Sequence, residues 1–154
     1  MPLSAMIGDK RLFINTEIKE KCLDIMREKL KEAGLQVEAI DLVLLGISVA
    51  EKDRGSAIIW PGCNDIGKKS EDKTMIISLN RLKDEQLGAL LAFAVNNFGA
   101  NDLQENINKA IELWQGLAEE GLKKLYCQYF IDFTNGEIDL QGFLHKINEL
   151  VERH

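Results

Sequence analysis

The chain has few of the residues on which common catalytic and metal sites are built. Its 154 residues include two histidines, two prolines and three cysteines. No CxxC, HxxxH or HxxE spacing occurs, although zinc sites usually need such a pattern. The three cysteines lie far apart and do not form the pattern of a disulfide framework. We therefore expect no metal, no cofactor and a reducing, cytoplasmic location.

The chain also lacks long hydrophobic runs and a surplus of basic charge. No apolar run approaches the roughly 20 residues needed to cross a bilayer, and residues 1–10 lack the pattern of a secretory signal. Acidic residues outnumber basic ones by 25 to 19, which gives a net charge of −6. Nucleic-acid binders usually concentrate positive charge on one surface, and no such basic stripe is present here beyond a local patch such as Lys68 and Lys69. We expect neither a membrane nor a nucleic acid as partner.

What is present is the composition of a soluble globular protein, with 45% hydrophobic and 29% charged residues. No repeat or linker divides the chain, so we predict a single domain over residues 1–154. We expect an α+β fold. A small, mostly antiparallel sheet of three to four strands occupies the N-terminal half, and a helix-rich C-terminal half packs on it. The predicted strands are residues 11–14, 35–50, 56–60 and 74–79, with 5–7 as a further short strand.

Local signals place the helices. Asn15 or Thr16 is a good N-cap for a helix that runs to a stop at Gly34. Further helices are predicted over residues 87–98, 101–118 and 122–133, and a last one after 136. The segment 35–50 fits either periodicity. Its β-branched residues and Gly46 favour a long strand, which is our prediction.

A long segment after Trp60 is the first candidate site. About a dozen irregular residues separate two apolar runs here, and loops of this length are often functional. An aromatic ring could stack a ligand while lysines meet an anion, and the alternative is that Trp60 only covers the core. The candidate ligand-binding residues are Trp60, Cys63, Asn64, Asp65, Lys68 and Lys69.

Two segments resemble known binding motifs but lack residues that those motifs need. Residues 62–68 match the GxxxxGK spacing of a phosphate-binding loop, but Lys69 stands where Ser or Thr should hold Mg²⁺. No room is left for the helix that such a loop requires. Residues 135–139 resemble half of an EF-hand loop, but Ile131 and Phe133 stand where carboxylates belong. Ordinary turns explain both segments better.

Catalysis has weak support in the sequence. The thiol of Cys63 lies near two lysines and would be a nucleophile if His145 served as its base. The simpler interpretation is a small, partly buried residue. Cys22 and Cys127 fall on apolar helix stripes and are expected in the core. No pair of carboxylates is marked out for acid–base chemistry, so we assign no catalytic residue.

The second candidate site is aromatic. Six of the ten aromatic residues fall between residues 114 and 143, and the segment 125–131 is apolar on more than one side. Either the protein's own fold or a second chain must cover it. Our leading hypothesis is a non-enzymatic, cytoplasmic, regulatory protein that binds another protein, or associates with itself, through its C-terminal helices. The alternative is a small-molecule or nucleotide-binding protein, or an enzyme, that uses the loop 60–69. The candidate protein-binding residues are Tyr126, Tyr129, Phe130 and Phe133.

Overall fold

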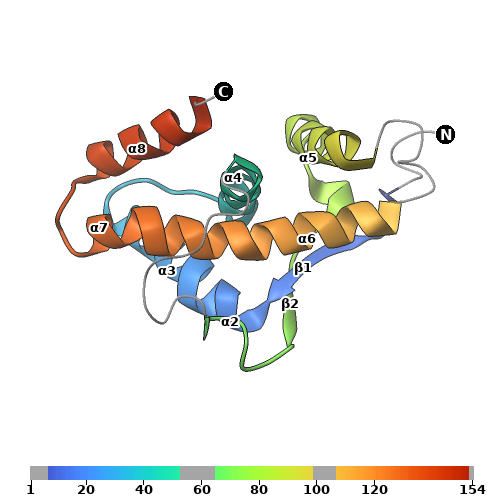
Figure 1. Cartoon of the computed structure of the whole chain (residues 1–154), viewed down its shortest axis with the longest axis horizontal. Coiled ribbons are helices and arrows are strands. Elements are labelled where there is room, and N and C mark those ends of the chain that lie inside the picture. The colour runs from blue at the N-terminus through green and yellow to red at the C-terminus, as the bar shows by residue number, and fades with distance from the viewer. Residues whose placement is uncertain (1–6, 53–64, 99–106, 153–154) are drawn as a thin grey trace.

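The computed structural model describes residues 7–52, 65–98 and 107–152. Helix α6 (Ile107–Lys124) runs through the middle of the molecule. The two strands and the helix α2–α3 lie on one side of it, and helices α4, α5 and α8 lie on the other (Figure 1). The core therefore has two halves that meet at α6, whose buried residues include the large side chain of Trp114.

The N-terminal unit is a strand that passes directly into a helix. Strand β1 (Arg11–Asn15) is followed by α2 (Thr16–Ile18), a π-helical turn η1 (Lys19–Leu23) and α3 (Asp24–Glu32). Asn15 caps this helix as predicted, because its side-chain oxygen accepts a hydrogen bond from the backbone N–H of Ile18 at 3.2 Å. The helix ends before Gly34, which has a φ of +94°, so the predicted stop is also confirmed.

The sheet of the described residues has two antiparallel strands, β1 and β2 (Lys73–Ser78). Leu12 pairs with Ile77 and Phe13 pairs with Met75, so one extra residue bulges from β2 between these pairs. The outer edge of β1 is covered by α6. The backbone N–H of Phe13 donates to Gln115 Oε1 at 2.8 Å, and the next outward N–H, that of Asn15, donates to Glu119 in the same way. Side chains four residues apart on α6 thus close the outer edge of β1.

The segment predicted as a long strand over residues 35–50 is a helix, α4 (Ala39–Lys52), so this prediction was wrong. The helix is buried on more than one side, and a helix covered all round loses the polar stripe that marks helical periodicity. Gly46 does not mark an extended segment. It lies against Gly121 of α6, and the two backbones touch there. A Cβ atom on Gly46 would come within 3.1 Å of the Leu122 backbone nitrogen.

The C-terminal half is helical, as predicted. After the 3₁₀ turn η3 (Leu79–Arg81), helix α5 (Asp84–Phe98) packs on α4 and α6. Helix α6 continues through a π-helical stretch η4 (Leu125–Phe130) into α7 (Ile131–Thr134), and α8 (Leu140–Glu152) follows a turn. The α+β class with a small antiparallel sheet is confirmed. Three to four strands are not found among the described residues; the predicted strand 56–60 and residues 5 and 6 lie outside them, and Ile7 is helical.

No helix in the described part of the chain is long and apolar enough to span a bilayer.

Candidate functional site

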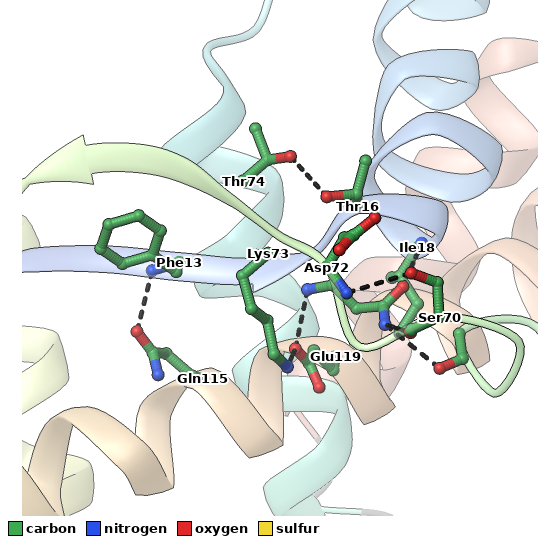
Figure 2. A network of polar contacts seen from close by, with 11 residues as sticks. Phe13, Thr16, Ile18, Ser70, Asp72, Lys73, Thr74, Gln115 and Glu119 are labelled. Atoms are coloured by element: carbon green, nitrogen blue, oxygen red, sulfur yellow. Dashed lines mark hydrogen bonds and ion pairs between the residues drawn. The ribbon is translucent and has the colours of Figure 1, made fainter.

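Residues 65–70, here called the lysine turn, are fastened to the end of β1 by one buried side chain. Asn15 is only 4% exposed. Its Nδ2 donates to the carbonyl oxygens of Gly67 at 3.1 Å and of Ser70 at 2.9 Å. Its Oδ1 is already used by the helix cap. Because donors and acceptor of the amide are all satisfied, this group holds the strand end, the helix start and the turn in one arrangement (Figure 2).

A second contact holds the turn from the first turn of the helix. The backbone N–H of Gly67 donates to Glu17 Oε1 at 3.0 Å. This hydrogen bond lowers the pKa of the Glu17 carboxyl from its ordinary value, and the nearby Lys21 and Lys69 add to the effect, while burial opposes it. Gly67 has a φ of +88°, and a Cβ atom there would come within 2.8 Å of Ile18 Cδ1. Glycine is therefore required at this position for two independent reasons.

Helix α6 completes the base of the site. Glu119 Oε2 accepts from the Asn15 N–H at 2.8 Å and from Lys73 Nζ at 2.6 Å. The Thr16 N–H donates to the carbonyl oxygen of Asp72 at 2.9 Å, next to a 2.7 Å contact between the hydroxyls of Thr16 and Thr74. Figure 2 shows that these contacts lie side by side where β1 and β2 leave the sheet. The turn is therefore held by the end of β1 and by α2, and α6 holds the strand ends beside it.

Three lysines give the site its charge. Lys68 and Lys69 are exposed, and neither forms an ion pair with another described residue. Lys123 on α6 lies close enough to the turn for the charge of Lys68 to act on it. Partial burial lowers the pKa of Lys123, and the positive charge of Lys68 lowers it further, against the opposing influence of Cys22, Asp65 and Glu119. We call the lysine turn together with Lys123 the lysine site.

Half of the predicted ligand-binding set falls in this site. Asp65, Lys68 and Lys69 all lie on the lysine turn, whereas Trp60, Cys63 and Asn64 lie outside the described residues. The Lys68 N–H donates to the Asp65 carbonyl oxygen at 3.2 Å, which closes a tight turn. No helix begins between Gly67 and β2, so residues 65–72 lack the element that a nucleotide phosphate loop needs.

The cysteines offer little thiol chemistry in the described residues. Cys22 is free and fully buried, and burial raises the pKa of its thiol to about 12, so almost no thiolate forms near neutral pH. Cys127 is buried as expected and is disulfide-bonded, a bond that the spacing of the three cysteines did not indicate. His145, the proposed base for Cys63, is 74% exposed on α8 and lies 3.1 Å from Glu149.

The predicted protein-binding residues form part of an aromatic cluster. Phe130 is fully buried, and its ring centroid lies 5.3 Å from that of Phe133 and 5.1 Å from that of Phe143 on α8. Tyr126 stacks on Phe130 at 6.2 Å. Tyr126, Tyr129 and Phe133 are half-buried. The protein's own fold therefore covers one side of this aromatic segment. That the segment binds a second protein stays a prediction.

A cavity of about 260 Å³ lies elsewhere, beside α3. Its lining combines opposite charges on Arg27, Glu28 and Lys31, with Gln36 and Val37 at its edge. The Arg27 guanidinium already donates to the Val37 carbonyl oxygen at 3.3 Å. This cavity contains none of the predicted site residues.

Comparisons with protein-family models, with curated proteins and with solved structures found no match. Function is therefore argued from geometry alone. Sequence reasoning found the lysines of the turn but missed Glu17 and Lys123, and it gave Asn15 only its role as a cap. Asn15 bonds to residues 52 and 55 positions away, and no local pattern encodes a contact of that kind.

Proposed function

We propose that this chain is a non-enzymatic protein-binding protein that holds an acidic segment of its partner on the lysine site. The observation that supports this function best is a rigidly held turn that presents unpaired positive charge. A preorganised surface loses little conformational entropy on binding, so its contacts contribute more of their energy to affinity. The regulatory role and the cytoplasmic location predicted from the sequence belong to this proposal, although a disulfide-bonded Cys127 is more usual in oxidising compartments.

The local charge balance favours an acidic partner. Two of the acidic groups beside the turn are already engaged: Glu17 with Lys21 and the Gly67 N–H, and Glu119 with Lys73. On the turn itself, Asp65 offsets one of the two lysines, which leaves residues 65–70 with a net charge of +1 (two basic residues against one acidic), while Glu71 and Asp72 follow directly and the chain as a whole carries −6. An acidic partner is repelled by most of the surface and attracted at one place, which fixes its orientation more than its affinity.

The same residues give little support to catalysis. No group of three or more His, Cys, Asp or Glu side chains that could hold a metal is found among the described residues. The free thiol is held protonated in the core, and His145 pairs with a neighbour on its own helix. A surface that binds through lysine ammonium groups needs none of these.

Reversal of the charge on the turn tests the proposal. We expect the double variant Lys68→Glu with Lys69→Glu to lose about tenfold or more of its affinity for a short, fluorescently labelled oligo-glutamate peptide, because two attractive charges become repulsive. Fluorescence anisotropy measures the affinity, and added salt should weaken binding to the original protein. The matched control is Lys29→Glu with Lys31→Glu on α3, two exposed lysines that lie away from the turn. Equal affinity of the two double variants would rule the proposal out.

Self-association through the C-terminal helices remains a second proposal. Leu144 on α8 is 39% exposed, next to Phe143 of the aromatic cluster. The exposed Leu144 and the half-buried Tyr129 and Phe133 of the C-terminal helices provide apolar area that a second copy would cover.

We expect Leu144→Glu to convert a dimer into a monomer in solution scattering at tens of micromolar protein. A charge placed in an apolar interface must be desolvated, which strongly opposes association. Val95→Glu on α5 is the control, because Val95 is also 39% exposed but lies on another helix. A strictly monomeric original protein under these conditions would contradict self-association.

A further inference from the structure

We infer that the cavity beside α3 binds a small zwitterion of the α-amino-acid type, with its carboxylate on Arg27 and its ammonium group on Glu28. One wall of this cavity is α3, and the other is the link from α3 to α4, at Gln36 and Val37. Figure 1 shows how this link joins the two helices. The cavity shares no residue with the lysine site, so its ligand is independent of the proposed function.

The link that forms one wall is fixed at both ends by hydrogen bonds. Across the stop at Gly34, the Leu35 N–H donates to the Leu30 carbonyl oxygen at 2.8 Å, as in a Schellman motif. At the other end, the Glu38 N–H donates to Asp41 Oδ2 at 3.0 Å, a contact that fixes the start of α4. The wall therefore keeps its position against α3 without a ligand.

Arg27 is the cation that suits a carboxylate. Its Nε donates to the Val37 carbonyl oxygen at 3.3 Å, which ties the side chain to the opposite wall. The other N–H groups of the guanidinium lie in the same plane and match the two oxygens of a carboxylate. Lys31 lines the same cavity one helical turn later, so it adds a second positive charge on this side.

Glu28 is the anion of the cavity, and it has no partner among the described residues. Neither Glu28 nor Arg27 nor Lys31 forms an ion pair within the part of the chain that the structure describes. Opposite charges that line one cavity without joining each other are left available to a ligand. A carboxylate only accepts hydrogen bonds, so the group that matches Glu28 is a cation such as an ammonium group.

The charges around the cavity are balanced once the neighbouring ion pairs are counted. Residues 24–38 carry three basic and four acidic side chains. Asp24 pairs with Lys19 at 2.9 Å, and Lys29 pairs with Glu32 at 3.5 Å. The charges that remain are two basic and two acidic ones: Arg27, Lys31, Glu28 and Glu38. A ligand of one sign would leave the other sign uncompensated, whereas a zwitterion matches both.

Size and charge also exclude other ligands from the cavity. Its volume of about 260 Å³ lies just below the range of about 300–1,000 Å³ that is usual for drug-sized ligands. An amino acid suits this volume better than a nucleotide does. An acidic peptide would be repelled by Glu28 and Glu38, so Lys31 is not expected to add to the affinity for oligo-glutamate.

The test compares three ligands that differ in charge: L-alanine, N-acetyl-L-alanine, which lacks the ammonium group, and L-alaninamide, which lacks the carboxylate. NMR shifts of the Gln36 and Val37 backbone amides report binding at constant pH and ionic strength. Ligand is added up to about 50 mM, because a ligand this small is expected to have a Kd of about 1 mM. We expect L-alanine to bind about tenfold more tightly than either analogue, because each analogue loses a charge-assisted contact.

Substitution of Glu28 tests its role directly. Glu28→Gln keeps the size of the side chain but removes its charge, so it should weaken L-alanine about tenfold. N-acetyl-L-alanine should bind this variant at least as well as the original protein. Glu32→Gln is the matched control, because Glu32 is another exposed glutamate of α3 that pairs with Lys29 and does not line the cavity. Circular dichroism checks that each variant is folded.

Three results would each overturn the inference. The first is the absence of shifts at Gln36 and Val37 at the highest concentration of L-alanine. The second is equal binding of L-alanine and N-acetyl-L-alanine, which would leave a simple anion site. The third is an equal loss in Glu28→Gln and Glu32→Gln, which would mean that only the overall charge of α3 matters. The double variant Lys68→Glu with Lys69→Glu should bind L-alanine as the original protein does, so failure of the proposed function is distinguishable from failure here.

Discussion

Gly121→Ala should destabilise the protein by about 4 kcal/mol or more, a large part of the stability of an ordinary domain. A methyl group on Gly121 would overlap the carbonyl group of Gly46 on α4. The obstacle is backbone, so no change of side-chain rotamer relieves it, and the two helices would have to move apart along a buried contact. Urea denaturation followed by circular dichroism measures the loss.

Gly116→Ala on the same helix is the matched control. A Cβ atom on Gly116 meets nothing within 4 Å, and the residue is exposed. Alanine is favoured over glycine in a helix interior by about 1 kcal/mol, so this variant should be slightly more stable than the original protein. A similar small change at both positions would mean that α4 and α6 are not in backbone contact at Gly121.

The same pair of glycines shows why the sequence misled us about the N-terminal half. Gly46 within a β-branched apolar run favours a strand when only its neighbours in sequence are considered. Glycine stands at position 46 because this part of α4 touches the backbone of α6 at Gly121, 75 positions later. The close contact needs a residue without a side chain on each helix. Elements with a polar face were predicted correctly, because their periodicity is visible. Helix α4 was not, because burial on several sides removes that signal.

The candidate site, like the fold, could be predicted only in part from the sequence. An irregular, lysine-containing segment after an apolar run indicated where Lys68 and Lys69 lie. The charge of Lys68 also acts on Lys123 of α6, and no spacing in the sequence predicts an effect between positions so far apart. Only one of the two roles of Asn15 could be predicted. A helix cap is a local signal in the sequence, whereas hydrogen bonds to a segment more than 50 positions away leave no such signal.

Replacement of Asn15 should have the second largest effect, and two different variants separate its roles. Asn15→Ala removes the helix cap and both donors to the turn, and it leaves buried partners unsatisfied. We expect a loss of about 3 kcal/mol in the free energy of unfolding. Asn15→Asp keeps an oxygen for the cap but turns an acceptor toward the carbonyl oxygens of Gly67 and Ser70. This variant should keep the helix and release the turn.

Amide hydrogen exchange distinguishes the two losses. In Asn15→Asp, the Gly67 and Lys68 amides should exchange faster while the amides of α3 remain protected, and affinity for an acidic peptide should fall although no lysine has changed. Asn108→Ala is the control, because the Asn108 side chain accepts only an exposed contact from Lys10 among the described residues, and such substitutions usually change stability by less than about 0.5 kcal/mol. If peptide affinity survives in Asn15→Asp despite faster exchange at the turn, the lysines act as independent charges. Rigidity of the turn would then contribute nothing to binding.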